Sequence, residues 1–249
     1  MAIYKAVPYR YLLLSILWLF TLLSAADSVR YAVTDVSWEP YWIMDGSKAS
    51  GISHEITLEL DKRLSVKLLP SKLLSVKRSK KAFDEGLVQI ECCVNIAWRK
   101  EQPAASVWSD TVLVVEEILV FPLGKAFKFE SIKDLKGRKI STIRGYGYVG
   151  DHLFTRSDSV SNVSQIRKLA LVRAEAGIID KAELSYIKKH IPELKAQWSA
   201  IELGPVINRS ELKVRIHHSR KGLLQPINLA INEMKQKGII KEIVNRYLY

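Results

Sequence analysis

Residues 31–56 read YAVTDVSWEPYWIMDGSKASGISHEI and contain, in order, the patterns of a strand, an aromatic loop and the start of a helix. The apolar residues of VRYAV at 29–33 indicate a short strand. Beyond Gly51, aliphatic residues recur every four positions from Ile52 to Leu64, which predicts a helix with one apolar face. A strand, a loop and a helix in this order are typical of α/β proteins.

The same alternation continues along the rest of the chain. Further strand-like runs are KLLP (67–70), VQIECCV (88–94), VLVV (112–115), ILVF (118–121), KISTI (139–143), AGIID (176–180) and KVRIHH (213–218). Helical patterns lie over Ile166–Val172 and Leu184–Ile191 and, on either side of Gly238, over Leu223–Lys237 and Ile239–Tyr247. These patterns predict an α/β fold with mostly parallel sheets. Because no Pro/Gly/Ser-rich linker divides the chain, we expect any two lobes to be joined by strands.

The composition fits an ordinary globular protein of one large domain or two lobes. Of the 249 residues, 48% are hydrophobic and 26% are charged, which excludes a disordered tail and a multi-span membrane protein. The formal charge is +12, and the run Lys77–Lys81 is strongly basic. This run lacks interleaved aromatic residues and belongs to no recognised nucleic-acid module. We therefore expect a solvated basic face and no nucleic-acid partner.

The first residues have the pattern of a secretory signal peptide. Lys5 and Arg10 precede an apolar run over 11–23, and small residues follow at 24–26. The run is shorter than the roughly 20 residues that span the hydrocarbon layer of a membrane. We predict cleavage after Ala26, which would lower the formal charge from +12 to +10. The mature protein is then expected in the periplasm.

The cysteine and histidine residues argue against a metal site. Cys92 and Cys93 are adjacent, so they cannot staple distant segments or form a four-ligand zinc site, and we expect free thiols. The residue four positions after His54 is leucine, so the second histidine of a metalloprotease helix is missing. His217 and His218 are neighbours in a strand-like run and should point to opposite faces. We expect no metal ion and no cofactor.

Two segments have features of a ligand-binding site. Trp38, Tyr41 and Trp42 follow the first strand, and loops at the carboxyl ends of strands bind ligands in open α/β sheets. Residues 144–150, RGYGYVG, follow the strand KISTI, and glycines at such a junction allow backbone N–H groups to approach an anion. This loop lacks the Lys-Ser/Thr ending of a nucleotide-binding loop, so ATP is not expected.

Taken in order, these motifs resemble the periplasmic solute-binding proteins of family 3, the polar amino acid type that serves ATP-driven importers. The resemblance extends from about Val29 to Tyr249. The segments that carry it are YAVTDVSWEPYW (31–42), GISHEI (51–56), IECCVNIAWRKEQPAASVWSD (90–110), DLKGR (134–138), GYG (145–147), GIID (177–180) and GIIKEIVNRY (238–247). The chain departs from the family where Asn95–Arg99 replaces its Thr-Pro-Glu-Arg turn, and where Tyr146 replaces a Ser or Thr.

The resemblance implies a two-lobed periplasmic binding protein fold of type II. Each lobe would be a mixed sheet flanked by helices, with two strand crossings forming the hinge. The expected first lobe comprises residues 27–113 and 213–249, and the expected second lobe comprises residues 114–212. The protein would be a monomer that closes on a small polar, amino acid-like ligand and delivers it to the membrane permease of an ATP-driven importer.

The resemblance also implies which residues contact the ligand. Arg99 matches the arginine that pairs with the ligand's α-carboxylate in the family. An arginine suits this role because its planar guanidinium can bind a carboxylate at two points. Asp180 matches the aspartate that holds the ligand's ammonium, and Trp38 would stack on the ligand. The full expected ligand-binding set is Asp35, Trp38, Tyr41, Asn95, Arg99, Tyr146, Gly147 and Asp180.

Two other functions remain open on the same fold. One is a periplasmic enzyme similar to cyclohexadienyl dehydratase, for which His54, Glu55 and Glu116 are the candidate acids or bases. The other is a sensor that passes its liganded state to a membrane receptor. The absence of a convincing catalytic base favours a binding protein over an enzyme.

Overall fold

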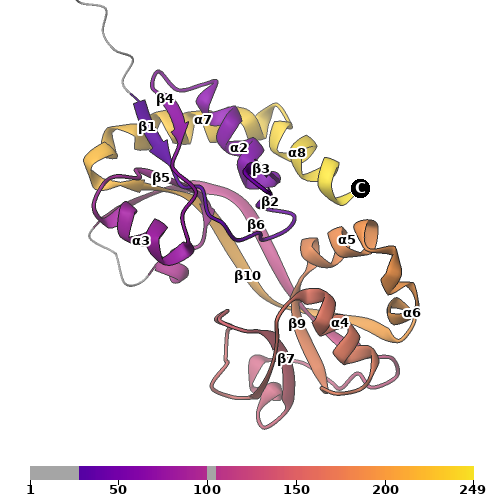
Figure 1. Ribbon diagram of the computed structural model, residues 1–249. Helices are drawn as coiled ribbons and strands as arrows, with labels where there is room; N and C mark the ends of the chain where they lie inside the picture. Colours follow the sequence, from indigo (N-terminus) through magenta and orange to yellow (C-terminus); the bar gives the residue numbers. More distant parts are fainter. Residues whose placement is uncertain (1–27, 100–104) are drawn as a thin grey trace, which may run out of the picture.

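A computed structural model describes residues 28–99 and 105–249 (Figure 1). Its centre is a mixed eight-stranded sheet in the order β4-β1-β5-β10-β6-β9-β7-β8. In that order the strands are Lys67–Pro70, Ser28–Tyr31, Ile90–Val94, Ile201–His217, Ser106–Pro122, Ala176–Asp180, Lys139–Ile143 and Thr155–Ser159. A separate hairpin is formed by β2 (Ile43–Asp45) and β3 (Lys48–Ser50).

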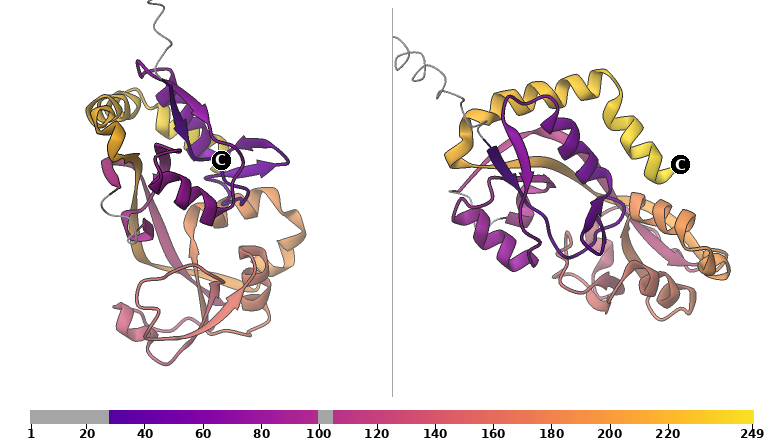
Figure 2. Two further views of the ribbon diagram at one scale, coloured as in Figure 1. Left: turned by 60° about the vertical axis from the view of Figure 1, so that its left-hand side comes forward. Right: turned by 45° about the horizontal axis from the view of Figure 1, so that its top comes forward.

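The helices gather in two groups at opposite ends of the sheet (Figures 1 and 2). The first lobe combines β1, β4 and β5 with α2 (Ile52–Asp61), α3 (Val76–Asp84), α7 (Leu224–Gln236) and α8 (Ile239–Leu248). The second lobe combines β7, β8 and β9 with α4 (Asn162–Ala170), α5 (Lys181–His190) and α6 (Lys195–Trp198). Short 3₁₀ helices span Ile96–Arg99, Ile132–Leu135, Pro192–Leu194 and His218–Leu223. This is the two-lobed α/β architecture that the resemblance implies.

The two lobes are joined by the long antiparallel strands β6 and β10 (Figure 1). Each strand has 17 residues, so VLVV and ILVF are parts of one strand and the prediction of two separate strands is wrong. The register shifts at several points, and such bulges increase the local twist without ending the pairing. The sheet is therefore continuous from lobe to lobe. Leu113 pairs with Leu212 inside this ladder, and the lobe boundaries expected there stay a prediction.

Each lobe has its own hydrophobic core. In the first lobe, Ile52, Ile56 and Leu60 of α2 are almost fully buried, which confirms the apolar face expected from their spacing. In the second lobe, α4 packs Ile166 and Leu169 against β6 and β9. Burying one side chain of this size stabilises a fold by roughly 1.5–3 kcal/mol. Because each lobe buries its own set of such side chains, each lobe is stabilised by its own core, and β6 and β10 connect the two.

The strand pattern directs the functional segments of both lobes toward the crossing strands. β5 ends at Val94, which pairs with Lys213 of β10. β9 ends at Asp180, which pairs with Glu117 of β6, and Glu117 in turn lies opposite Asn208 of β10. The carboxyl ends of β5 and β9 thus lie on either side of the paired strands β10 and β6, level with Lys213 and Asn208 of β10. The loops that follow these ends can meet between the lobes.

The expectation of free thiols is wrong. Cys92 and Cys93 are joined by a disulfide bond, although they are adjacent in β5. Cys93 has a positive φ of 65°, and this backbone turn brings the two side chains to the same side of the strand. Cys93 is buried in the first-lobe core and Cys92 packs against it.

The segment expected to be a signal peptide, residues 1–26, lies outside the described residues. Within residues 28–99 and 105–249, no helix combines the length and the apolar character that a membrane span requires.

Candidate functional site

Asp180 lies at the contact between the two lobes. It ends β9 and caps α5, because its Oδ1 accepts hydrogen bonds from the backbone N–H groups of Ala182 at 2.9 Å and Glu183 at 3.0 Å. Tyr41, from the first lobe, donates its hydroxyl to the same oxygen at 3.0 Å. Asp180 is only 8% exposed, and its other oxygen, Oδ2, is buried with no hydrogen-bond partner among the described residues.

A second buried carboxyl group, that of Glu183, lies one turn farther along α5. Its two oxygens accept hydrogen bonds from Trp38 Nε1 of the first lobe and Asn162 Nδ2 of α4. On the neighbouring strand β6, Glu117 accepts a hydrogen bond of 2.7 Å from Asn208 Nδ2. Glu117, Asp180 and Glu183 are called the carboxylate cluster below. Its members come from a strand, a strand end and a helix of the second lobe.

The carboxylate cluster is surrounded by neutral groups. Burial raises the pKa of Glu183, and the neighbouring charge of Asp180 raises it further. Burial likewise raises the pKa values of Asp180 and Glu117 above those of ordinary carboxyl groups. The main opposing influences on the three pKa values are hydrogen bonds from neutral donors rather than contacts with cations.

Two cations near the crossing strands, Lys181 and Arg209, pair with another carboxylate. Lys181 lies 3.4 Å and Arg209 lies 2.9 Å from the two oxygens of Glu116, whose side chain is partly exposed. Adjacent residues of a strand point to opposite faces, so the side chains of Glu116 and Glu117 point to opposite faces of β6, although the charge of Glu116 still raises the pKa of Asp180. The carboxylate cluster is therefore well placed to attract a positively charged group.

Aromatic side chains cover the cluster from the first lobe. The rings of Trp38 and Tyr41 have centroids 4.3 Å apart, and Trp98 meets Trp38 edge to face at 5.4 Å. Tyr41 is buried, and burial together with Asp180 raises its pKa. From the second lobe, Tyr146 is close enough to the cluster that partial burial and then Glu183 raise its pKa to about 12.

Gly51 holds this aromatic loop in position. It has φ of 104°, and a Cβ there would lie 2.7 Å from the carbonyl oxygen of Tyr41. The first backbone N–H groups of α2 bind the same loop, since Ile52 donates to Pro40 at 3.0 Å and Ser53 donates to Tyr41 at 2.8 Å. The start of α2 is thus occupied by the chain's own carbonyl groups.

Arg99 is engaged away from the carboxylate cluster. Its Nε lies 2.9 Å from Oε2 of Glu91, and its terminal NH2 group contacts the other oxygen of the same carboxylate. Its remaining nitrogen donates to the carbonyl of Trp98 at 3.0 Å. Glu91 also pairs with the fully buried Arg215 at 3.3 Å. The role of Arg99 in binding a ligand carboxylate stays a prediction, but its guanidinium already has an acceptor for every nitrogen.

The other expected site residues lie on the surrounding loops. Asp35 is exposed, and its backbone N–H donates to Leu74 at 3.0 Å. Asn95 caps the 3₁₀ helix that contains Arg99, since its Oδ1 accepts from Ala97 N at 2.8 Å. Gly147 follows Tyr146, and a Cβ at this position would contact nothing. Of the eight expected residues, the structure brings Trp38, Tyr41 and Asp180 into a hydrogen-bonded or ring contact, with Tyr146 close by.

Sequence reasoning missed the carboxyl groups of Glu117 and Glu183 and the amide of Asn162 as members of this site. A signal for Glu183 was available, since an acidic residue three positions after a helix-capping aspartate is a helix-start pattern. That pattern places Glu183 in the first turn of α5, but it does not reveal the contact with Trp38, 145 positions away.

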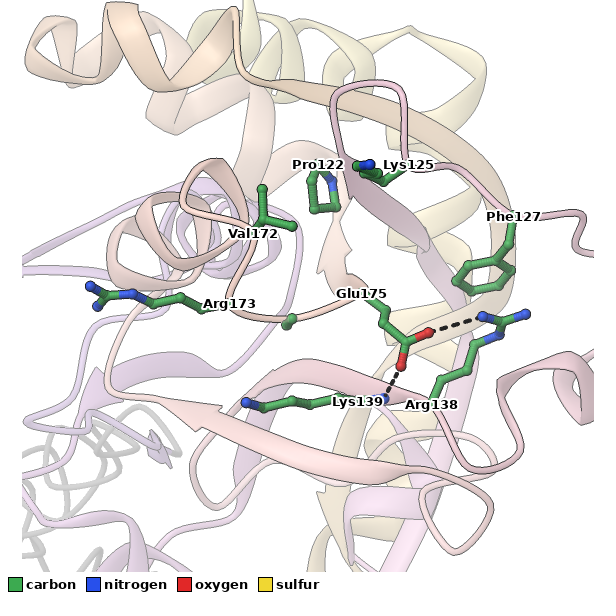
Figure 3. A pocket seen from close by; sticks show the side chains of 9 residues that line it. Pro122, Lys125, Phe127, Arg138, Lys139, Val172, Arg173 and Glu175 are labelled. Carbon is green, nitrogen blue, oxygen red and sulfur yellow. Dashed lines mark hydrogen bonds and ion pairs between the residues drawn. The ribbon is translucent and has the colours of Figure 1, made fainter.

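A groove of about 650 Å³ lies at the opposite edge of the second lobe (Figure 3). Here Glu175 binds Arg138 at 3.0 Å and the backbone N–H of Lys139 at 2.9 Å, and the Arg138 guanidinium lies over the ring of Phe127 at 3.6 Å. This groove lies at the amino ends of β7 and β9. Because α/β sheets bind ligands at the carboxyl ends of their strands, the lobe contact is the stronger candidate. No metal-binding group of His, Cys, Asp and Glu occurs among residues 28–99 and 105–249.

Comparison with known proteins relates this arrangement to solved structures. No protein-family model and no curated protein matches the sequence. The ligand-binding core of GluR0 in complex with L-glutamate superposes with a TM-score of 0.67 at 16% identity, covering 91% of this chain and 100% of that one. An ancestral arginine-binding protein bound to arginine gives 0.65 at 20% identity, covering 89% and 98%. The chain has the type II periplasmic binding protein fold.

This binding-protein fold confirms the architecture implied by the sequence resemblance. A third structure with the same fold is the ancestral amino acid-binding protein AncCDT-1, described as a precursor of cyclohexadienyl dehydratase. It gives a TM-score of 0.64 at 17% identity and covers 89% of this chain and 96% of that one. Similarity at these identities establishes the fold, and the ligand has to be argued from the site itself.

Proposed function

We propose that this protein captures a small polar solute carrying a positive charge between its two lobes and delivers it to an ATP-driven importer in the membrane. The observation that carries the proposal is the buried, unpartnered Oδ2 of Asp180 at the lobe contact. A buried carboxylate oxygen without a partner is costly, and an ammonium or guanidinium group of a ligand would satisfy it. The binding-protein fold supports a transport role for such a site.

Lobe closure provides the coupling between binding and delivery. The lobes touch through Tyr41 and Asp180 and through Trp38 and Glu183, so a ligand enters when β6 and β10 allow the lobes to separate. A ligand stabilises the closed form only by the difference between its affinities for the two forms. The closed form binds the ligand more tightly because both lobes contact it, whereas in the open form only one lobe does.

A ligand screen tests this function. Thermal unfolding of the purified protein would be measured with amino acids, amines and small carboxylates, since a ligand of the native state raises the melting temperature. We expect a rise with a positively charged solute and its loss in Asp180→Asn, which retains a helix-capping side chain. No shift with any compound of the panel would contradict the proposal.

An enzyme on the same fold is the second candidate. The observation in its favour is Glu183, a buried carboxyl group with a raised pKa at the lobe contact, because such groups can serve as general acids. The precursor relationship of AncCDT-1 to a dehydratase supports the same alternative. Incubation with a hydroxylated cyclic acid, followed by chromatography of the products, distinguishes the two functions. Turnover that is lost in Glu183→Gln would favour the enzyme.

A further inference from the structure

We infer that the ligand is a small organic cation, an amine or a guanidinium compound, and that its recognition requires no carboxylate. This inference rests on the proposed binding function and specifies the class of solute. It follows from the charges on both sides of the lobe contact and from the groups that already occupy the positions where a ligand carboxylate would bind.

The first argument is that three carboxyl groups meet at the lobe contact without a cation among their hydrogen-bond partners. Glu117, Asp180 and Glu183 approach one another in the second lobe, and the hydrogen bonds to them from Asn208, Tyr41, Trp38 and Asn162 come from neutral side chains. Burial raises the pKa of each carboxyl group, and a bound ammonium group would favour the ionised forms. A ligand that also carries a carboxylate would add a negative charge beside these groups and oppose their ionisation.

The second argument is that Arg99 is already engaged by Glu91. Two of its nitrogens bind the carboxylate of Glu91, and the third binds the carbonyl of Trp98. Two of the five N–H groups of the guanidinium are left, so a ligand carboxylate would have to share Arg99 with Glu91. Displacing Glu91 instead would disturb its pair with the buried Arg215 and would be energetically unfavourable.

The third argument concerns the backbone groups that commonly bind anions. The first N–H groups of α2 bind the carbonyls of Pro40 and Tyr41, and those of α5 bind Asp180. In the glycine turn of the second lobe, the Tyr146 N–H bonds to the Ile143 carbonyl at 3.2 Å. The starts of α2 and α5 are thus filled by groups of the chain itself.

Two cations at this edge of the second lobe lie near Asp158. Arg156 pairs with Asp158 at 2.9 Å, and Arg144 lies close enough to Asp158 to lower its pKa. The aromatic groups at the lobe contact add a positive reason for a cationic ligand. Trp38, Tyr41 and Trp98 present ring faces and edges there, and ring faces attract ammonium and guanidinium groups.

Matched pairs of amino acids and their decarboxylated amines test this inference. Isothermal titration of the purified protein would compare arginine with agmatine, ornithine with putrescine, and lysine with cadaverine. The members of each pair share the distal cation and differ in the carboxylate. We expect at least one amine to bind, with an affinity about tenfold or more above that of its amino acid.

The possible results separate this inference from the proposed function. An amino acid that binds about tenfold better than its amine would overturn the inference and leave the binding function intact. Binding only of neutral or acidic solutes in a wider screen would overturn the inference and the cationic part of the proposed function. The absence of binding by every compound would overturn both.

Two variants test the residues behind the argument, each checked for native folding by circular dichroism. Glu183→Gln removes a carboxyl group that a bound cation would keep ionised, and it should weaken amine binding about tenfold or more. Glu116→Gln removes a nearby carboxylate that pairs with Lys181 and Arg209, and it should retain amine affinity within about twofold. Full amine binding in folded Glu183→Gln, or an equal loss in both folded variants, would contradict the inference.

Discussion

The hydroxyl of Tyr41 donates a hydrogen bond of 3.0 Å to Oδ1 of Asp180, and this bond joins the two lobes. Both residues are buried, and they are separated by 139 positions in the sequence. The acceptor oxygen also binds two backbone N–H groups of α5. The Asp180 carboxylate therefore caps α5 and binds Tyr41 of the first lobe through Oδ1, while Oδ2 has no hydrogen-bond partner among the described residues.

Tyr41→Phe is expected to lower the free energy of unfolding by about 1–2 kcal/mol, because one buried hydrogen bond to a carboxylate is lost while the ring remains. Urea denaturation followed by circular dichroism measures this change. Tyr186→Phe is the matched control, since no hydrogen bond of the Tyr186 hydroxyl is found in the described part of the chain. An equal loss in both variants would show that the lobe contact contributes nothing.

Stability is expected to fall as the pH rises from about 5 to 8, partly because of Glu183. Burial raises the pKa of this carboxyl group above the unfolded value of about 4.3, so the native protein keeps a proton that the unfolded chain releases. The native state binds more protons in this range, and the free energy of unfolding therefore decreases with increasing pH. This loss of stability is absent only at pH values below the unfolded pKa, where the carboxyl group is protonated in both the native and the unfolded state.

In Glu183→Gln, the fall in the free energy of unfolding between pH 5 and pH 8 should be smaller by about 1–2 kcal/mol. The measurement is a series of denaturant titrations at several pH values. Glu116→Gln is the control, because Arg209 and Lys181 lower the pKa of Glu116 and its contribution is lost toward acid pH instead. A wild-type slope that persists unchanged in Glu183→Gln would argue against a protonated Glu183.

Glu91→Gln should destabilise the first lobe more than Arg99→Gln does. Glu91 is the carboxylate that Arg99 and the fully buried Arg215 share, and Arg215 also lies over the Phe83 ring at 3.7 Å. Removing the shared anion leaves two neighbouring cations and should cost about 3 kcal/mol. Arg99→Gln preserves the pair with Arg215, and we expect about 1 kcal/mol. Urea midpoints of the two variants provide the comparison, and the reverse order would refute this account.

Gly51→Ala should lower the free energy of unfolding by about 2–3 kcal/mol, since the new Cβ meets the Tyr41 carbonyl at 2.7 Å and φ is 104°. It should also weaken ligand binding, because the clash shifts the aromatic loop that carries Tyr41. Gly124→Ala is the control: Gly124 has a positive φ of 67° but nothing within 4 Å of a Cβ. Thermal unfolding of both variants separates the clash from the backbone strain, and equal losses would exclude the clash.

Much of the fold follows from short-range sequence patterns. The runs KLLP, KISTI and AGIID coincide with β4, β7 and β9, and the four-residue spacing after Gly51 correctly predicted α2. These patterns are informative because strand alternation and helix periodicity depend on neighbouring residues. The sequence patterns do not predict the short strand Thr155–Ser159, because its sequence TRSDS is polar and it is extended through its pairing with β7.

The sequence by itself determined the two-lobed α/β architecture, and it singled out Trp38, Tyr41 and Asp180 as candidates for ligand contact. Only the tertiary structure decided that Glu183 joins them, that Glu91 engages Arg99, and that Cys92 and Cys93 form a disulfide. The physical reason is that these pairings depend on where side chains arrive in space. Trp38 and Glu183 are 145 positions apart in the sequence, and they are in contact because β6 and β10 bring the two lobes together.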